Sequence, residues 1–212
     1  KGKKALVTAG PTYEAIDPVR FIGNHSSGKM GYALAEELAS RGAEVTLVSG
    51  PTGMKTKSPN IRLIQVTSAA QMFQSCKDQP YDIAVMAAAV ADYTPVEVAG
   101  QKIKKSGETL ELKLKKTEDI LAMLGRSKKN GQLLVGFALE TQNESENARK
   151  KLQEKNADLV VLNSLNDEGA GFGHDTNKVT LFYKDGKQQE LALQSKSSVA
   201  KAIVNAIIDL KS

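Results

Sequence analysis

Apolar runs of strand length alternate with segments of helical period along most of this chain, and that alternation restricts the folds it can adopt. Strands are predicted over residues 5–8, 44–48, 61–66, 82–88, 133–137 and 159–162. Helices are predicted over residues 33–41, 68–77, 118–124, 144–155 and 197–210. Such repetition is typical of a mostly parallel sheet with helices on both faces. We therefore predict an α/β fold with a doubly wound, mostly parallel, Rossmann-like sheet.

Two segments depart from this rhythm. Residues 91–116 contain proline and glycine and then an alternation of polar and apolar residues that ends at Leu114. We predict an excursion from the sheet that ends in an exposed strand. Near the C-terminus, residues 179–183 and 190–193 flank an Asp-Gly turn, which predicts a β-hairpin. Because no linker composition divides the chain, we expect one domain over residues 1–212.

The composition and the N-terminal residues indicate where in the cell this protein is located. The longest apolar run, residues 83–91, is too short to span a bilayer, and the first residues lack the apolar stretch of a signal peptide. We therefore expect a cytoplasmic protein with no membrane partner, and the single Cys76 fits a reducing compartment. The chain begins with Lys1 and not with Met, so we expect a piece of a longer polypeptide and leave an upstream domain open.

The net charge of +5 indicates an anionic partner. Nucleic-acid binding would pair basic residues with stacking aromatic residues, but aromatic residues make up only 5% of the chain and no RNA-binding or zinc-finger pattern is present. We therefore expect small phosphorylated ligands and no nucleic acid. Ligands of such sheets bind beyond the carboxyl ends of the strands. The candidate segments are residues 10–12, 49–50, 89–92 and 138–141, and the chain from Asn163 onward.

The richest candidate is the run of small residues 23–31, which directly precedes a helix. Backbone N–H groups of Ser26, Ser27 and Gly28 at a helix start favour a phosphate. A Walker A site is disfavoured because Met30 replaces the hydroxyl residue that would hold magnesium. A Rossmann dinucleotide site is disfavoured because no G-x-G-x-x-G follows the first strand. The structural alternative is a serine N-cap followed by glycines that permit close helix packing.

Other polar candidates have equally ordinary alternatives. Asp92 follows a buried strand of small residues, where a carboxylate can hold a cation, or merely form an Asx turn. The lysines that begin at Lys102 either form a solvated face or supply an ammonium to a phosphate. Lys151 and Lys155 share a helix face and either reach into water or flank a nucleotide. Phe137 either stacks on a base or fills the core.

Histidine and metal chemistry are poorly represented. His25 lies beside the phosphate loop without the partners of a catalytic triad, and His174 lies in a separate glycine-rich segment. No cluster of His and Cys is present, so any Mg²⁺ is expected to be carried largely by a triphosphate.

Six separated motifs occur together, and in this order they resemble bacterial phosphopantothenate-cysteine ligases over essentially the whole chain. They are Ala9-Gly10-Pro11-Thr12, Asp17-Pro18-Val19-Arg20, Asn24-His25-Ser26-Ser27-Gly28-Lys29-Met30-Gly31, residues 88–93, Lys102-Ile103-Lys104-Lys105 and Gly136-Phe137-Ala138-Leu139-Glu140-Thr141. The resemblance implies that CTP and Mg²⁺ activate the carboxylate of 4'-phosphopantothenate as an acyl-cytidylate. L-cysteine then forms the amide and CMP leaves. Such ligases are commonly the C-terminal half of a bifunctional protein with a flavin-dependent decarboxylase, so FMN is expected only if that upstream domain exists.

The resemblance also implies site residues. Asn24 and Lys102 take the catalytic positions, and Asn24 with His25 binds substrate. Asp92 takes the metal position. The nucleotide positions are Gly10, Ser26, Ser27, Gly28, Met86, Ala87, Ala88, Asp92, Lys102, Lys116, Thr117, Glu118, Phe137, Lys151 and Lys155. The family usually has Asn-Pro where this chain has Thr117-Glu118, which weakens those two assignments. Members of this kind are homodimers in which the excursion around residues 94–115 pairs the subunits and covers the site.

Two other functions remain open from the residues alone. An NAD(P)-dependent oxidoreductase shares the fold expectation, but no ribose-binding carboxylate is found at the end of the second strand. A non-catalytic nucleotide-binding module would share the phosphate loop and carry out no reaction.

Overall fold

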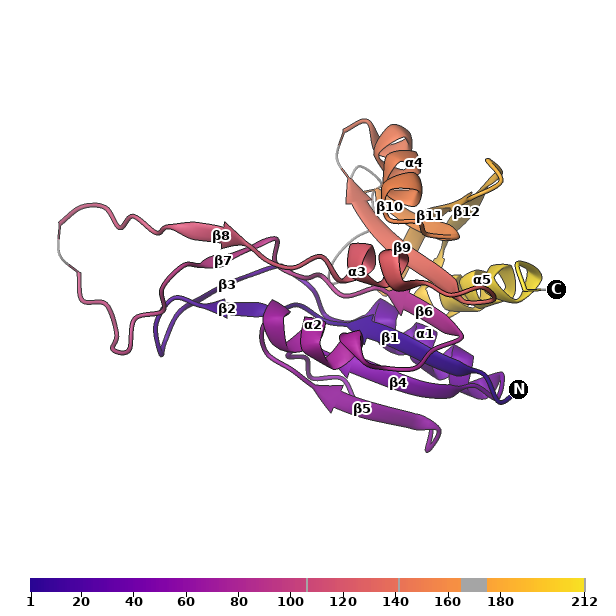
Figure 1. Cartoon of the computed structure of the whole chain (residues 1–212), viewed down its shortest axis with the longest axis horizontal. Helices are drawn as coiled ribbons and strands as arrows, with labels where there is room; N and C mark the ends of the chain where they lie inside the picture. The colour runs from indigo at the N-terminus through magenta and orange to yellow at the C-terminus, as the bar shows by residue number, and fades with distance from the viewer. Residues whose placement is uncertain (106, 141, 165–174, 212) are drawn as a thin grey trace.

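The main sheet has the strand order of a doubly wound α/β fold. The structure is a computed structural model that describes residues 1–105, 107–140, 142–164 and 175–211. Within these residues the sheet has eight strands in the order β12-β11-β10-β9-β6-β1-β4-β5 (Figure 1). They are β1 (Lys4–Ala9), β4 (Glu44–Ser49), β5 (Ile61–Gln65), β6 (Ile83–Met86), β9 (Leu133–Glu140), β10 (Leu159–Ser164), β11 (Thr176–Tyr183) and β12 (Gln188–Ser195).

The first six of these strands in chain order are parallel and are arranged 3-2-1-4-5-6, with the chain reversing direction across the sheet between β1 and β6. The last two strands form an antiparallel hairpin that extends the sheet beside β10. The predicted fold class and the predicted C-terminal hairpin are therefore confirmed.

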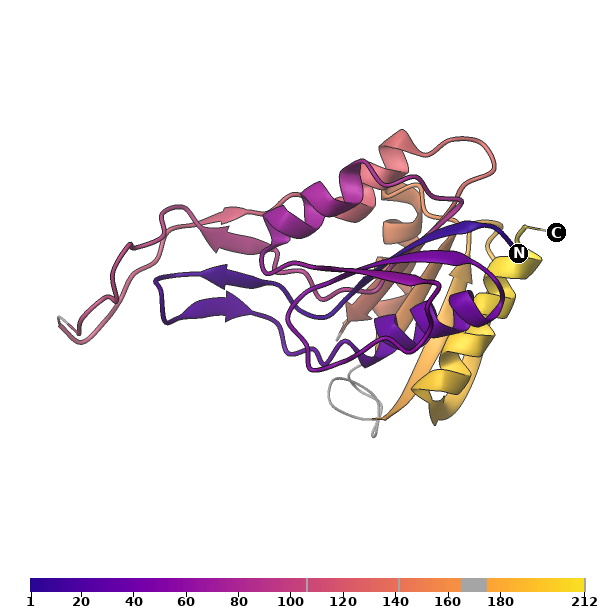
Figure 2. The same ribbon diagram turned by 90° about the horizontal axis from the view of Figure 1, so that it is seen from below.

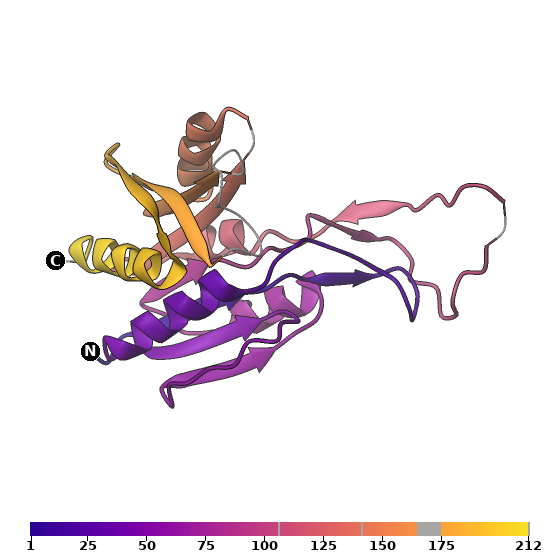
Figure 3. The ribbon, with the colours of Figure 1, turned by 180° about the vertical axis from the view of Figure 1, so that it is seen from behind.

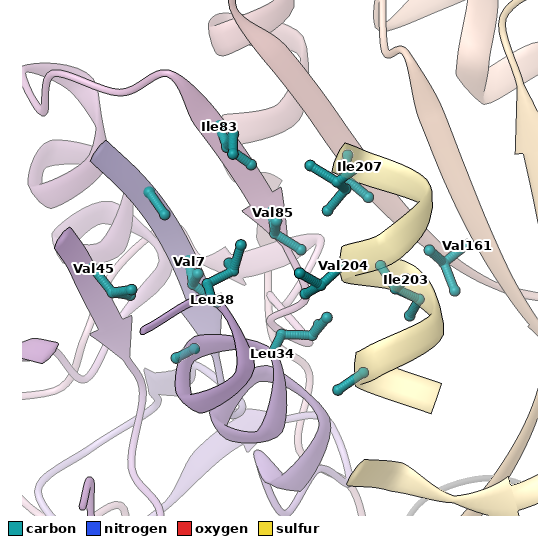
Figure 4. Packing of buried hydrophobic residues seen from close by; sticks show 14 of the residues in the cluster. Val7, Leu34, Leu38, Val45, Ile83, Val85, Val161, Ile203, Val204 and Ile207 are labelled. Carbon is teal, nitrogen blue, oxygen red and sulfur yellow. The ribbon is translucent and has the colours of Figure 1, made fainter. Parts of the chain in front are cut away.

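Five helices cover the sheet within the described residues. They are α1 (Lys29–Ser40), α2 (Ala69–Lys77), α3 (Ile120–Ser127), α4 (Glu144–Glu154) and α5 (Lys196–Asp209). α1 and α5 pack together on one face, as Figure 3 shows, whereas α2, α3 and α4 cover the other face. In Figure 4, Leu34 of α1 and Val204 of α5 lie over Val7 and Val85 of the sheet. Removal of this apolar surface from water is the main stabilising contribution to the fold.

Local signals set the ends of several helices. Ser68 and Gln71 form a capping box at α2, and Asp119 accepts a hydrogen bond from the N–H of Ala122 at the start of α3. Gly42 follows α1 with φ 85°, the left-handed conformation with which a glycine commonly ends a helix. β6 ends at Met86, two residues before the predicted end of that strand.

An arm projects from one end of the sheet and consists of residues 13–23 and 93–116, of which residue 106 is not described (Figures 1 and 2). The excursion predicted from residues 91–116 is confirmed as an antiparallel pair, β7 (Tyr93–Pro95) with β8 (Leu114–Lys116). The other pair, β2 (Tyr13–Ala15) with β3 (Phe21–Gly23), lies in a segment for which the sequence predicted no strand. Its short strands lack a readable alternation, and the stacked rings of Tyr13 and Phe21, 3.9 Å apart, stabilise it.

Apolar side chains are unusually exposed along this arm. They are Val19, Phe21, Tyr93, Val96, Val98, Leu110, Leu112 and Leu114.

None of the helices in the described parts of the chain is both long and apolar enough to cross a membrane. His174 lies outside the described residues.

Candidate functional site

Two adjoining cavities open beyond the carboxyl ends of the strands, near β1 and β6, where the strand order reverses. Their volumes are about 480 Å³ and about 500 Å³, and we call them the first and second cavity. They share one boundary, lined by Ala88, Val90, Asp92, Phe137 and Lys151. This is the place at which ligands bind in doubly wound sheets.

The phosphate loop forms one wall of the first cavity, which residues 23–31 line without a break. Gly28 is the N-cap of α1, with φ 76°, and it has no side chain with which to cap the helix. The alternative of a serine N-cap is therefore wrong: Ser26 instead accepts a hydrogen bond from the N–H of Gly28 at 3.3 Å. The backbone donors of the first turn of α1 consequently remain available to an anion in the cavity.

Gly31 brings that helix start onto the sheet. A Cβ atom at Gly31 would lie 2.5 Å from the Cβ of Ala9 and 2.9 Å from the carbonyl oxygen of Thr8. The expectation that a glycine here permits close helix packing is thus confirmed, and the phosphate loop is held directly above the end of β1.

Gly10 supports the loop from behind and does not line either cavity. It has φ 74°, and a Cβ at Gly28 would lie 3.4 Å from its Cα. The neighbouring post-strand segments 10–12 and 49–50 pack against each other, since Gly50 leaves no room for a side chain beside the carbonyl of Pro11. Two of the candidate strand ends therefore form the support of the site and not its surface.

Asn24 ties the phosphate loop to the segment that follows β6. Its amide nitrogen donates hydrogen bonds to the carbonyl oxygens of Val90 at 3.0 Å and Ala89 at 3.3 Å. Asn24 and its neighbour His25 are both exposed and both line the first cavity. Two segments far apart in the sequence thus share one wall.

Asp92 lies at the boundary between the cavities. The chain around it is fixed through its backbone: the N–H of Thr117 donates to the carbonyl of Asp92 at 2.9 Å, and the Thr117 hydroxyl donates to the carbonyl of Ala91 at 2.7 Å. The Asp92 side chain itself is exposed. Among the described residues, no three His, Cys, Asp or Glu side chains are grouped to hold a metal ion. A cation here would need ligands from a second source, such as phosphates.

Lys151 reaches the same boundary from α4. Its ammonium donates to the carbonyl oxygen of Phe137 at 2.8 Å. Burial lowers the pKa of Lys151 below its ordinary value, against the opposing effect of the carboxylates of Glu140, Asp119 and Asp92. Phe137 is half-buried and lines both cavities, so it also contributes an aromatic surface to the site.

Most of the remaining predicted nucleotide residues line the second cavity. Met86, Ala88, Lys116, Thr117 and Glu118 line it, together with Asp119, whereas Ala87 lines the first cavity. Lys155 does not line either cavity but pairs with Asp119 at 3.0 Å. Burial alone would raise the pKa of Asp119, but the hydrogen bond from Ala122 and the Lys155 ammonium lower it below its ordinary value. Lys155 therefore contacts the second cavity only indirectly, through the Asp119 carboxylate in its wall.

Lys102 lies on the arm and does not line either cavity of its own chain. The next residue, Ile103, is held to the turn between β2 and β3: its N–H donates to the Asp17 carboxylate at 3.1 Å, and its carbonyl accepts from Arg20 at 2.9 Å. Asp17 also accepts from the Arg20 guanidinium, which keeps the pKa of that carboxyl well below its ordinary value. These hydrogen bonds fix the backbone of the lysine segment at Ile103, although that segment lies away from the cavities.

Four further polar residues line the first cavity, and the sequence did not identify two of them, Asn177 and Lys196. They are Lys29, Asn163, Asn177 and Lys196. Asn163 was a candidate because it lies at the carboxyl end of a predicted strand. Asn177 and Lys196 come from the start of the last hairpin and the start of α5, where no strand end signals a ligand. The pairing of β11 with β10 places Asn177 beside the phosphate loop, and the packing of α5 against α1 places Lys196 there.

The chain is similar to one family of proteins over nearly its whole length. The family model described as the DNA/pantothenate metabolism flavoprotein C-terminal domain matches residues 1–210. The coenzyme A biosynthesis bifunctional protein CoaBC of Bacillus subtilis is 50% identical over 99% of this chain and 52% of its own length. A cysteine/cysteine sulfinic acid decarboxylase of an unknown prokaryotic organism is also 50% identical, over 99% of this chain and 59% of its own length. The chain thus spans a little over half the length of these relatives.

A crystal structure of the C-terminal domain of a CoaBC protein has the same fold. It is 45% identical to this chain, the match covers 98% of this chain and 94% of that domain, and the TM-score is 0.83.

Proposed function

The chain belongs to the DNA/pantothenate metabolism flavoprotein C-terminal domain family, and from this premise we propose that it is the ligase that joins 4'-phosphopantothenate to L-cysteine with CTP. The product is 4'-phosphopantothenoyl-L-cysteine, an intermediate of coenzyme A biosynthesis. The proposal rests on the likeness to CoaBC proteins and on a site that suits a nucleotide and a second substrate. We place this reaction in the cytoplasm.

The reaction has two steps. In the first, a carboxylate oxygen of phosphopantothenate attacks the α-phosphorus of CTP, and the electron pair of the broken P–O bond leaves with pyrophosphate. In the second, the amine of cysteine attacks the acyl carbon, CMP leaves, and the amine loses a proton. Because both steps end with negative charge on the phosphate oxygens of a leaving group, preorganised donors around the phosphates are the main requirement.

One observation carries the proposal: the Lys151 ammonium lies at the boundary of two cavities, opposite a phosphate loop with uncapped backbone donors. We assign the cytidine to the second cavity, with Phe137 and residues 116–118, and the α-phosphate to the boundary. The triphosphate then extends along the loop of Ser26 to Gly28 in the first cavity. Asn24, which lines that cavity, is assigned to the acyl-cytidylate, since its amide can bond to carbonyl and phosphate oxygens without titrating.

Mg²⁺ fits this arrangement as a companion of CTP. Asp92 offers the hard oxygen ligand that Mg²⁺ prefers, at the boundary where the α-phosphate is assigned. The described residues supply no full set of protein ligands, which agrees with an ion held mainly by phosphates and water. The ion would neutralise charge on the triphosphate. FMN enters the proposal only with an upstream decarboxylase domain.

We propose further that the protein is a homodimer in which the arm of one subunit covers the cavities of the other. The exposed apolar side chains of the arm support this, because an apolar surface of this kind is characteristic of a protein interface. The position of Lys102 gives a second reason. A lysine that supports chemistry at the α-phosphate but lies away from the cavities of its own chain must reach a site on another chain.

The alternatives find less support in this geometry. A nicotinamide enzyme would place a carboxylate after β4 to hold a ribose, but Ser49 and Gly50 occupy that position and pack against the Pro11 segment. A non-catalytic module remains distinguishable by assay alone.

The test is to supply the protein with CTP, Mg²⁺, 4'-phosphopantothenate and L-cysteine, and to measure pyrophosphate release and amide formation. We expect both products in equal amounts, and pyrophosphate release without cysteine limited to about one equivalent of acyl-cytidylate. CTP binding without any pyrophosphate release would support the module instead. NADPH binding without CTP binding would support the oxidoreductase.

A further inference from the structure

A further cavity lies at the amino ends of the strands, at the end of the sheet opposite to the candidate site. Its volume is about 230 Å³, and we call it the distal cavity. Ile83, the first residue of β6, and Ala43, directly before β4, both line it. Figure 1 shows the N-terminus and the end of α5 at this end of the molecule and the arm at the other. The distal cavity shares no lining residue with the first or second cavity, so it is a separate site.

The floor of the distal cavity is apolar. α1 and α5 pack side by side, and residues of both helices and of β6 belong to one core layer, in which Figure 4 shows Leu38, Ile83 and Ile207. These three side chains are buried, whereas Ile208 is 42% exposed. An aliphatic ligand chain on this floor would be removed from water, which favours its binding. The apolar lining residues are Leu38, Ala43, Ile83, Val204, Ile207 and Ile208.

Basic side chains surround this floor, and no acidic side chain among the described residues lines the cavity. The basic residues are Lys1, Lys3, Arg41 and Lys211. Two carboxylates lie beside them: Asp82 is 3.8 Å from the Lys3 ammonium, and Glu37 accepts a hydrogen bond from Arg41 at 2.9 Å. The C-terminal ends of α1 and α5 also border the cavity, and each is equivalent to about half a negative charge. Four cations therefore face about three negative charges, which leaves about one positive charge for a ligand.

Lys211 is the basic residue that lacks an acceptor. Its ammonium nitrogen is buried and donates no hydrogen bond to any described residue. One carboxylate oxygen of Asp82 lies 4.0 Å from that nitrogen, which is beyond hydrogen-bond range. The other oxygen accepts from the N–H of Lys4 at 2.8 Å, which holds the carboxylate in place. Because buried polar atoms are almost always satisfied, the Lys211 ammonium indicates a missing acceptor in the distal cavity.

We propose that the distal cavity binds a small aliphatic monocarboxylate, with its carboxylate on the Lys211 ammonium and its chain along the apolar floor. A single negative charge matches the surplus on the rim, whereas a phosphate monoester carries about two. At the packing density of protein interiors, the cavity holds roughly ten non-hydrogen atoms, which is the size of octanoate. The inference concerns a site separate from that of the proposed function and does not depend on the ligase reaction.

Calorimetric titration with butanoate, hexanoate, octanoate and decanoate tests the fit of the chain. Each added methylene should strengthen binding about fourfold up to octanoate, and decanoate should gain little because its chain exceeds the cavity. Octan-1-ol has the same chain without the charge and should bind about tenfold more weakly than octanoate, or weaker still. Affinities that do not depend on chain length would contradict the inference, because they would indicate ion pairing at the surface alone.

Lys211→Met tests the head group. Octanoate should bind to this variant about tenfold more weakly or worse, octan-1-ol should change by less than about twofold, and Lys211→Arg should restore most of the loss. Lys201→Met is the matched control, because Lys201 is an exposed lysine of α5 that does not line the cavity. It should bind both ligands as wild type does.

Thermal unfolding guards against misfolding of the variant. Lys211→Met replaces an unpaired buried ammonium by an apolar group of similar length, so its Tm should equal that of wild type or exceed it. Octanoate should raise the Tm of wild type and of Lys201→Met in proportion to its binding, and should raise that of Lys211→Met much less.

Other occupants of the cavity give different results. Displacement of octanoate by CTP would place it among the phosphate-binding groups of the first cavity. A change of oligomeric state in Lys211→Met, measured by size-exclusion chromatography, together with no octanoate binding to wild type, would make the rim a contact between copies. Octanoate binding that is lost in a longer chain extended before Lys1 would assign the cavity to that upstream segment. Each of these results, or an equal loss for octan-1-ol in Lys211→Met, would overturn the inference.

Discussion

The ammonium of Lys151 donates a hydrogen bond to the backbone carbonyl of Phe137 at 2.8 Å, which fixes a charge from α4 on the strand β9. A lysine head group normally samples many positions, but here a main-chain atom sets its place at the boundary of both cavities. The nucleotide therefore binds beside a preorganised cation. The conformational entropy of the Lys151 side chain is lost when the protein folds and not when the nucleotide binds.

Replacing this lysine should affect turnover more than folding. We expect Lys151→Met to lower kcat/KM for CTP by about 100-fold, the effect typical of one preorganised electrostatic group. Lys150→Met, on the exposed side of the same helix, should leave kcat/KM within about twofold, as for a solvated surface charge. Steady-state kinetics with both variants tests this, and equal rates for Lys151→Met and wild type would remove Lys151 from the site.

The pH dependence of CTP binding should reveal the same group. Since burial lowers the Lys151 pKa from 10.5, CTP affinity should fall as pH rises through a value below that of an ordinary lysine. The free energy of unfolding responds in the opposite sense. The folded chain holds this proton less tightly than the unfolded chain, so the group's contribution to stability grows as pH rises from its lowered pKa toward 10.5. Calorimetric titrations with CTP over the alkaline range should show the decline in CTP affinity in wild type and not in Lys151→Met. Parallel affinity profiles for the two proteins would contradict the prediction.

Gly31 should be intolerant of even one methyl group. Gly31→Ala places its Cβ within 2.5 Å of Ala9 and forces α1, with the phosphate loop, away from β1. Overpacking of this kind costs about 1–3 kcal/mol, and CTP affinity should fall with it. Gly53→Ala is the matched control, because a Cβ there meets nothing within 4 Å. Denaturant unfolding compares the two, and similar stabilities would show that α1 adjusts without strain.

Asp17 should stabilise the arm in a pH-dependent way. Its carboxylate accepts from the Arg20 guanidinium and from the N–H groups of Val19, Arg20 and Ile103, and these bonds lower its pKa. The contribution to stability is therefore present above the ordinary value of 3.8 and is lost as pH falls through the lowered pKa. Asp17→Asn should lower the Tm by a constant amount between roughly pH 5 and 8, and that difference should shrink in more acidic solution. Asp78→Asn, at an exposed position, should show no such trend.

Much of the fold was predictable because its signals are local. Runs such as residues 83–86 and 133–137 are apolar enough to be predicted as buried strands, and Gly42 marks the end of α1 through its own backbone freedom. The hairpin of β2 and β3 was not predictable in this way. Its strands have three residues each, and pairing with a sequence-distant partner, through Asp17 and Ile103, stabilises it.

The residues of the site also differ in whether a local sequence signal identifies them. Asp92, Phe137 and the phosphate loop follow or precede regular elements, so the sequence identifies them as candidates. Lys196 gives no such signal, because its position in the wall of the first cavity depends on the packing of α5 beside α1. Gly10 differs from Lys196 in the opposite way. It directly follows a strand, where a ligand-binding residue is expected, but it lies behind the phosphate loop, next to Gly28, and lines neither cavity.

The position of Lys102 permits a decisive test of the proposed dimer. If Lys102 of one subunit serves the cavities of the other, a mixed dimer of Asn24→Asp and Lys102→Gln subunits contains one site with both changes and one with neither. Each variant alone should be nearly inactive, whereas an equal mixture that has exchanged subunits should recover about a quarter of wild-type activity, since half of the dimers are mixed and each has one intact site. If Lys102 instead serves its own chain, every site carries one change and mixing recovers nothing. Size-exclusion chromatography of Leu112→Lys supplies the companion measurement, because a charge among the exposed leucines of the arm should favour monomers and abolish the recovery.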